Sequence, residues 1–140
     1  MRVIVTGSRD WSDLHQVCRA LETVYKLAEQ RETLPLTVVH GGCPTGADAM
    51  AAAWAYLAAQ DLDLAVIEQV YEADWSRGKV AGPERNARMV RDGAHLVLAF
   101  HQDNSKGTAD TIRRAEAAGI PCHVYTASTA RESVTSDGKR

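Results

Sequence analysis

One stretch of the chain, residues 38–54, restricts the possible folds more than any other. The apolar run 36–39 ends at His40-Gly41-Gly42, a Pro44-Thr45-Gly46 turn follows, and an alanine-rich segment comes next. This order predicts a strand, a glycine loop and a helix. Paired glycines at a strand end let a ligand approach the backbone because they carry no Cβ. The positive end of the following helix favours an anion, so we expect a nucleotide-type ligand at this loop.

The same stretch also has a purely structural interpretation, which stays open at this point. Thr45 and Asp48 have the spacing of a capping box, with Asp in place of Glu, and such a box starts a helix without any ligand. Gly41 and Gly46 have phosphate-loop spacing, but Ala47 and Asp48 replace the lysine and the hydroxyl residue of that motif. No GxGxxG occurs, so the standard dinucleotide fingerprint is absent.

Short apolar runs alternate with helical patterns along the chain. Strands are expected at residues 2–6, 36–40, 65–71, 94–100 and 121–125, and helices at about 13–28, 47–59, 84–91 and 108–118. Such alternation predicts an α/β fold, a three-layer sandwich with a five-stranded parallel sheet in the order 3-2-1-4-5. Residues 1–125 are expected to form one domain. Residues 126–140 have little apolar content and are expected to form a disordered tail.

Composition and charge exclude several kinds of partner for this 140-residue chain. The net charge of −2 offers no electrostatic footprint for nucleic acid or an anionic membrane. No apolar run approaches the ~18 residues of a membrane span, and no signal peptide is recognisable. The cysteines Cys18, Cys43 and Cys122 are odd in number and far apart, which indicates a reducing, cytoplasmic location. The histidines have no metal-ligand spacing, and no metal or cofactor is predicted.

The predicted strand order places a topological switch point between the first and fourth strands. Ligands bind there, outside the carboxyl ends of the strands. Three segments of small or cationic residues meet at this point: Gly7-Ser8-Arg9, His40-Gly41-Gly42 and Ser105-Lys106-Gly107-Thr108. We therefore expect a binding site formed by segments that are distant in sequence.

Some residues of these segments have two possible roles. The Arg9 guanidinium suits a phosphate, but it could equally form an ion pair with Asp10 or Asp13. Thr108 could cap the following helix and also donate to a ligand, or it could act only as a cap. Both alternatives stay open from the sequence.

The segment 72–82 is longer than most connections in such a fold, and long loops are often functional. Trp75 lies in it and could stack on a base. Arg85 and Arg88 follow on one face of the next helix. With Asn86 they could form a cationic and hydrogen-bonding wall, although a solvated helix face is the alternative.

Three motifs, in this order, resemble the SLOG superfamily of Rossmann-like proteins. They are VVHGGCPTGADAM (38–50), ADWSRGKVAGPERNARMV (73–90) and KGTADTIRRAEAAGIP (106–121). The similarity is greatest to the YspA-like branch, formerly a domain of unknown function, and it covers residues 1 to about 125. The resemblance implies a Rossmann-like sheet that binds a nucleoside phosphate or an ADP-ribose-like ligand. Members of the superfamily often occur in bacterial and phage genomes.

The catalytic relatives in this superfamily are the LOG phosphoribohydrolases, which cut the N-glycosidic bond of a nucleoside monophosphate and are typically homodimers. Their signature arginine corresponds to Arg85. Their catalytic glutamate corresponds to Thr111, with Asp110 one residue earlier. That offset rotates a helical side chain by about 100°, so we expect Asp110 to be a poor substitute. Glu84 and Asp48 are the other carboxylates that could assist an oxocarbenium-like transition state.

Three functions therefore remain as alternatives. The first is a binding domain for a nucleotide-derived ligand, for example a sensor in a phage or bacterial system, and the missing glutamate favours it. The second is a nucleoside-monophosphate N-glycosidase with Arg85, Glu84 and Asp110 as catalytic candidates. The third is a non-catalytic dimeric interaction module. The ligand-binding candidates all lie near the expected switch point: Gly7, Ser8, Arg9, Gly41, Gly42, Thr45, Gly46, Asp48, Trp75, Arg85, Asn86, Ser105, Lys106, Gly107 and Thr108.

Overall fold

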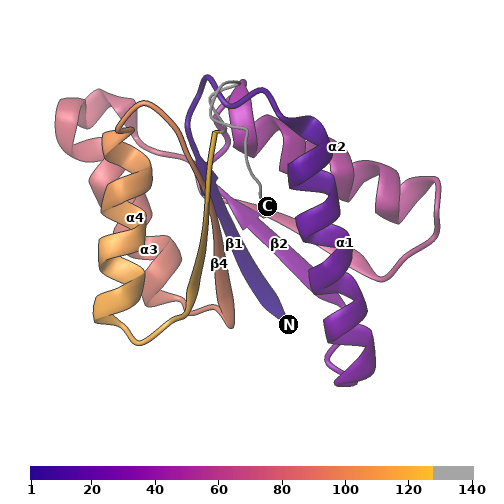
Figure 1. Ribbon diagram of the computed structural model, residues 1–140. Helices are drawn as coiled ribbons and strands as arrows, with labels where there is room; N and C mark the ends of the chain where they lie inside the picture. Colours follow the sequence, from indigo (N-terminus) through magenta and orange to yellow (C-terminus); the bar gives the residue numbers. More distant parts are fainter. Residues whose placement is uncertain (128–140) are drawn as a thin grey trace.

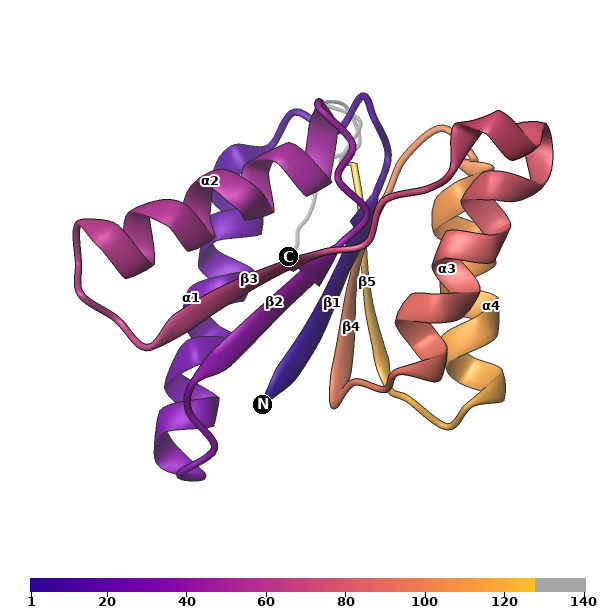
Figure 2. The same cartoon turned by 180° about the vertical axis from the view of Figure 1, so that it is seen from behind.

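The computed structural model describes residues 1–127 and contains a five-stranded parallel sheet in the order β3-β2-β1-β4-β5. Helices α1 and α2 cover one face, and α3 and α4 cover the other (Figures 1 and 2). The predicted three-layer fold and strand order are confirmed. The elements are β1 (Arg2–Gly7), α1 (Leu14–Gln30), β2 (Leu36–His40), α2 (Gly46–Gln60), β3 (Val66–Val70), the 3-10 helix η1 (Trp75–Val80), α3 (Ala81–Arg91), β4 (Leu96–His101), α4 (Lys106–Ala117) and β5 (Cys122–Thr126).

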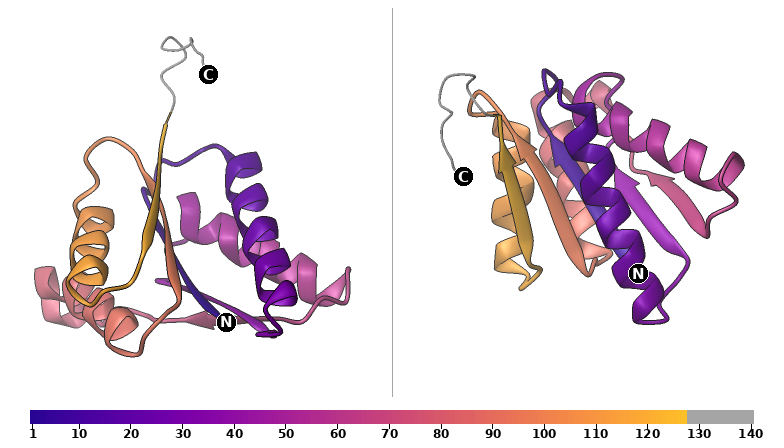
Figure 3. Two further views of the ribbon diagram at one scale, coloured as in Figure 1. Left: turned by 60° about the horizontal axis from the view of Figure 1, so that its bottom comes forward. Right: turned by 45° about the vertical axis from the view of Figure 1, so that its right-hand side comes forward.

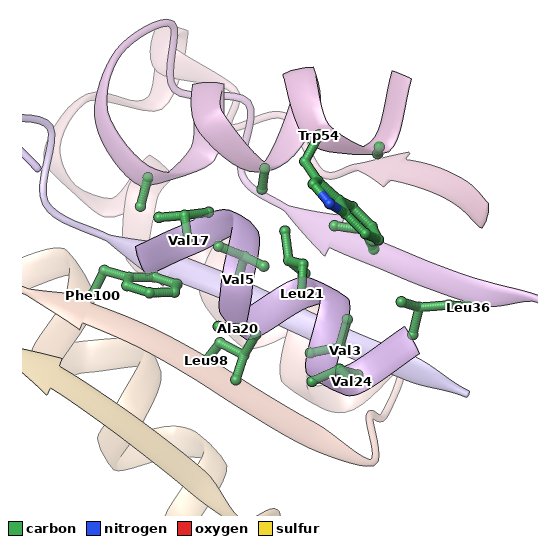
Figure 4. Packing of buried hydrophobic residues seen from close by; sticks show 14 of the residues in the cluster. Val3, Val5, Val17, Ala20, Leu21, Val24, Leu36, Trp54, Leu98 and Phe100 are labelled. Carbon is green, nitrogen blue, oxygen red and sulfur yellow. The ribbon is translucent and has the colours of Figure 1, made fainter. Parts of the chain in front are cut away.

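The sheet separates two apolar cores because successive strand residues point to opposite faces. Val3 and Val5 of β1 pack toward α1 and α2, whereas Ile4 between them belongs to the core beneath α3 and α4. Figure 4 shows the first core, in which Leu21 of α1 and Trp54 of α2 approach the sheet. Nearly all of β4 is buried, as its apolar sequence predicted. The view in Figure 3 shows the helix pairs on opposite sides of the sheet.

Several predicted boundaries differ from the structure. The segment 72–82 is partly helical, because η1 occupies most of it and α3 begins at Ala81. Helix α4 begins at Lys106, and Ser105 rather than Thr108 caps it. Thr126 belongs to β5, where it pairs with His101, so it is not part of a tail. The rest of the predicted tail, residues 128–140, lies outside the described residues. Within residues 1–127, no helix is long and apolar enough to span a membrane.

All five carboxyl ends of the strands lie at one edge of the sheet, since the strands are parallel. The loops after β1 (indigo) and β4 (orange) both lie at the top of Figure 1. The β1 loop touches the start of α2 very closely: a Cβ at Gly46 would lie 2.2 Å from the Ser8 carbonyl oxygen, and one at Gly7 would lie 2.4 Å from Cβ of Ala47. Glycine at these two positions therefore permits the close approach of β1 and α2.

Candidate functional site

A cavity of about 590 Å³ opens at the carboxyl ends of the strands. The β1 end, the glycine loop, the η1–α3 segment and the start of α4 contribute its walls. Thirteen of the fifteen ligand-binding candidates line it: Gly7, Arg9, Gly41, Gly42, Thr45, Asp48, Trp75, Arg85, Asn86, Ser105, Lys106, Gly107 and Thr108. The topology thus brings together residues that the strand order predicted to meet.

Three predicted site residues do not line the cavity. The Ser8 hydroxyl is buried and exchanges hydrogen bonds with the backbone of Gln102, at 2.8 Å in each direction, so it joins the β1 and β4 loops. Gly46 packs against the β1 loop. Glu84 accepts hydrogen bonds of 2.7 and 2.9 Å from Arg77, and these hydrogen bonds, with the charge of Arg77, lower the pKa of Glu84. Ser8, Gly46 and Glu84 therefore have structural contacts and are not part of the cavity wall.

The glycine loop is held by two buried side chains. Nδ1 of His40 accepts the Gly42 N–H at 3.0 Å, and Nε2 of the same ring lies 2.6 Å from Glu68 on β3. The Asp48 carboxylate accepts the Cys43 N–H at 3.2 Å. Because Nδ1 accepts, the ring is the neutral tautomer whose proton is on Nε2 and points to Glu68. Two consecutive amides of the loop are thus already bonded within the protein.

The capping box of Thr45 and Asp48, which the sequence left open as a structural alternative, is not formed. Thr45 occupies the N-cap position of α2, but its side chain makes no capping hydrogen bond. Gly46 follows with a φ of +72°, so the chain does not enter the helix in the geometry that lets an N-cap oxygen reach the first turn. Asp48 instead bonds to Cys43, outside the helix.

Asp48 is a buried carboxyl on the cavity wall, with 8% of its surface exposed. Burial raises its pKa above the ordinary value, and the hydrogen bond from the Cys43 amide and the positive charge of Arg85 only partly offset this effect. Asp48 forms no ion pair with any other residue that the structure describes.

Arg85 projects from α3 across the glycine loop. Its Nη1 donates to the Gly41 carbonyl at 2.6 Å, and its Nε donates to Asn86 at 2.8 Å. A Cβ at Gly41 would lie 2.5 Å from Nη1, so glycine there leaves room for the guanidinium. Partial burial lowers the pKa of Arg85, although the nearby Asp48 opposes this shift. The cation is therefore fixed against the loop rather than free in solvent.

Asn86 connects Arg85 to the start of α4. Its amide nitrogen donates to the Gly107 carbonyl at 3.3 Å and to Asp110 at 3.1 Å, while its oxygen accepts from Arg85. Asn86 is 4% exposed, and its hydrogen-bonding groups are occupied. A polar network thus runs from the glycine loop through α3 to α4.

Asp110 lines the cavity, whereas Thr111, which corresponds to the relatives' catalytic glutamate, is fully buried and donates to the Gly107 carbonyl. The two neighbouring side chains point in different directions because one residue turns a helix by about 100°. Asp110 is nevertheless engaged by Arg113 and by Arg114 at 2.9 Å. Partial burial raises its pKa, but the hydrogen bonds from Arg114 and Asn86 outweigh this, and the pKa lies below its ordinary value.

The start of α4 is the second helix terminus on the cavity. Ser105 caps the helix by accepting the Thr108 N–H at 3.4 Å, and its hydroxyl lies 3.0 Å from that of Thr108. The amides of Lys106 and Gly107 come next, in the first turn, where a helix leaves N–H groups without an intrahelical acceptor. These donors and the positive helix end are suited to an anion.

Unpaired cations line the same cavity. Within residues 1–127, Arg9, Lys79 and Lys106 line the cavity and form no ion pair. The ion pair of Arg9 with Asp10 or Asp13, which the sequence left open, is therefore not formed. Arg88 does not line the cavity, and it donates to the Glu72 carbonyl at 2.7 Å. The cavity thus has a surplus of positive charge that the protein does not neutralise.

An aromatic and apolar wall completes the cavity. Trp75 is 61% exposed, and its ring lies 3.8 Å from where a Cβ on Gly82 would be. Pro83 and Met89 line the same cavity. An exposed indole beside apolar side chains offers a surface for a planar ring.

Sequence reasoning missed several residues of the wall. They are Val5, Thr6, Cys43, Pro44, Lys79, Gly82, Pro83 and Met89. Lys79 could have been found from the sequence, because it lies in the segment 72–82, whose length is typical of functional loops. Among the described residues, no group of His, Cys, Asp or Glu is arranged to hold a metal ion.

Comparison with known proteins agrees with this architecture. Residues 1–78 match the YAcAr family, described as "YspA, cpYpsA-related SLOG family". The chain is also 43% identical over 121 residues to the "Gene 61 protein" of Mycobacterium phage D29, a match that covers 86% of this chain and 92% of the phage protein. The glycine loop, the parallel sheet and these similarities together lead to one conclusion: the chain belongs to the YspA, cpYpsA-related SLOG family.

Proposed function

We propose that the cavity binds a nucleotide-derived small molecule, a nucleoside phosphate or an ADP-ribose-like compound. The observation that carries this proposal is the surplus of unpaired cations, Arg9, Lys79 and Lys106, which line the cavity together with the start of α4. A phosphate group would receive charge-assisted hydrogen bonds from these side chains and from the first amides of the helix. Membership of the SLOG family supports the same class of ligand.

The other parts of the cavity fit the rest of such a ligand. Trp75 offers a face on which a base can stack, and Asp48 offers a carboxyl for hydroxyl groups. A cavity of about 590 Å³ lies within the range of small-molecule sites. The biological role we favour is that of a ligand-binding domain, for example a sensor in a phage or bacterial system, because Thr111 stands where the catalytic relatives have glutamate.

A specific observation also favours a second candidate, an N-glycosidase acting on nucleoside monophosphates. Two carboxyls line the cavity, and their environments shift their pKa values in opposite directions: burial raises that of Asp48, and arginines lower that of Asp110 despite its partial burial. Such divergence is common where one carboxyl acts as an acid and another stays ionised. Thr111 in place of the relatives' glutamate argues against it.

A thermal-shift panel with product analysis tests both candidates. The panel contains AMP, ADP, NAD, ADP-ribose, cyclic nucleotides and an N6-substituted AMP, and each sample is analysed for free base by mass spectrometry. A ligand at 100 times its dissociation constant stabilises a protein by about 2.7 kcal/mol. Stabilisation with intact ligand supports a binding domain, whereas release of base supports the glycosidase. No stabilisation by any compound would contradict both and leave the dimeric interaction module.

A further inference from the structure

We infer that the free edge of β3 and the exposed face of α2 together form a surface that binds a second copy of this chain, with the two β3 strands antiparallel about a two-fold axis. This surface is separate from the cavity, because no residue of β3 lines the cavity and Asp48 is the one residue of α2 that does. Within residues 1–127, β3 pairs with β2 alone and lies at one end of the sheet, with α2 packed against it (Figure 2).

The backbone of β3 presents hydrogen-bonding groups along its free edge. The Tyr71 amide donates to the His40 carbonyl of β2, and this bond fixes the phase of the ladder. Alternate residues of a parallel strand bond to the same neighbouring strand. The N–H and C=O groups of Glu68 and Val70 therefore point away from β2, toward the free edge.

The edge lacks the features that commonly stop a strand from pairing with another chain. Such features are proline, lysine or a β-bulge. The sequence of β3, VIEQV, contains no proline or lysine, and its five residues pair with β2 in an uninterrupted register. Its one charged side chain, Glu68, is bonded to His40 on the neighbouring strand. The edge is therefore open to another strand.

The helix beside this edge has an exposed face without charge. Asp48 is the one charged residue of α2, and it is buried. The exposed residues of the helix are all uncharged: Ala53, Tyr56, Leu57 and Gln60. A surface helix normally turns charged side chains to water, and a helix that is apolar on all sides is normally covered. The exposed face of α2 therefore indicates a protein partner.

Exposed apolar side chains are concentrated at the same edge. Of the nine large apolar side chains that are exposed within residues 1–127, five lie between positions 56 and 70: Tyr56, Leu57, Leu62, Ile67 and Val70. Concentrations of this kind mark interaction surfaces.

The opposite edge of the sheet differs in this respect. Among the described residues of β5, Val124 is the one large apolar side chain that is exposed. Helix α4 beside β5 exposes the charged residues Lys106, Arg113 and Glu116. The comparison favours β3 over β5 as the edge that pairs.

A second copy fits this surface because the surface is complementary to itself. A two-fold axis through Gln69, perpendicular to the sheet, places Glu68 of each copy opposite Val70 of the other. The outward N–H and C=O groups of these residues then bond to each other. The two Glu68 carboxylates do not lie directly opposite one another, an arrangement that would be destabilising. The axis also places the two α2 helices on the same face of one continuous sheet.

Sedimentation equilibrium of the full chain over a wide concentration range tests the inference. The average mass of the wild type should rise with concentration from 15.2 kDa toward twice that value. Val70→Pro removes one edge N–H from each copy and should raise the dimer dissociation constant about 10-fold or more. Tyr56→Lys places a charge on the exposed face of α2 and should also weaken the dimer. Circular dichroism establishes that each variant is folded.

Two matched control variants carry the same changes elsewhere. Val124→Pro alters an edge residue of β5 whose N–H also points away from the sheet, because the Pro121 carbonyl bonds to β4 and fixes the phase of that ladder. Leu14→Lys places the same charge at an exposed apolar position of α1. Both controls should associate like the wild type.

Amide hydrogen exchange adds a measurement that needs no variant. The Glu68 and Val70 amides of the wild type should exchange more slowly as the protein concentration rises, whereas the Val124 amide should not change. A wild type that keeps the mass of one chain at every concentration would overturn the inference. A dimer whose Glu68 and Val70 amides stay unprotected, or one that Val124→Pro weakens as much as Val70→Pro, would overturn it as well. None of these results depends on nucleotide binding, so they do not bear on the proposed function.

Discussion

The close contact between β1 and α2 makes Gly46 the glycine whose replacement should be most costly. In Gly46→Ala the new Cβ would lie 2.2 Å from the Ser8 carbonyl oxygen and 2.8 Å from the backbone of Arg9. Both neighbours are backbone atoms, so they cannot rotate away. The residue also has a φ of +72°, which costs alanine about 1–2 kcal/mol. Overpacking adds about 1–3 kcal/mol, so the total loss of unfolding free energy should be about 2–5 kcal/mol.

Gly119→Ala is the matched control for this prediction. Gly119 has a nearly identical φ of +77°, but no atom lies within 4 Å of its added Cβ. It should lose only the backbone part, about 1–2 kcal/mol, and any effect of alanine on the unfolded chain should be similar in both variants. Urea denaturation measures both losses from the midpoints at constant slope. If Gly46→Ala loses no more than Gly119→Ala, the close approach does not constrain the fold.

Three further predictions address the site. Ser105→Ala should cost about 1 kcal/mol of unfolding free energy because it removes the α4 cap. Thr45→Ala should cost much less because Thr45 makes no capping hydrogen bond. Equal losses of the two variants in urea denaturation would contradict this prediction. Asp48 binds its proton more tightly in the folded than in the unfolded protein, so its contribution to stability falls as pH rises from about 3.8 through its raised folded pKa. The unfolding free energy of Asp48→Asn should therefore rise relative to that of the wild type over this pH interval. Parallel curves of unfolding free energy against pH for the two proteins would refute this prediction. Nitrogen NMR at neutral pH should find His40 protonated on Nε2 and not on Nδ1, which accepts the Gly42 amide; a proton on Nδ1 would exclude that bond.

The fold was predictable because its signals are local and repeated. The apolar run of β4, buried along nearly its whole length, and the β-branched run of β1 are typical of central strands in a parallel sheet. The predicted bounds of β2 agree with the structure, since His40 and the following glycines mark its end sharply. The start of α3 was missed, because Gly82 and Pro83 weaken the helical pattern although both lie in its first turn.

The site was predictable in its location but not in its hydrogen bonds. Residues that follow strands, such as Arg9 and Lys106, meet because parallel strands bring their carboxyl ends to one edge. The partners of Asp48 and His40 depend on how the glycine loop turns and on the register of β2 with β3, which pairs Val38 with Glu68. Sequence spacing carries no information on such side-chain directions, and for Asp48 it indicated a capping box that is not formed.

The central claim is that the unpaired cations of the cavity hold the anionic group of a nucleotide, and one titration tests it most directly. The affinity of AMP and ADP is measured by calorimetry for the wild type, Arg9→Ala and Lys106→Ala, with Lys26→Ala on the exposed surface of α1 as the control. The two cavity variants should each lose about 1.5–3 kcal/mol of binding free energy, which is about 10- to 150-fold in affinity, while Lys26→Ala should bind like the wild type. Unchanged affinity in both cavity variants would contradict the assignment of the anion to these two cations.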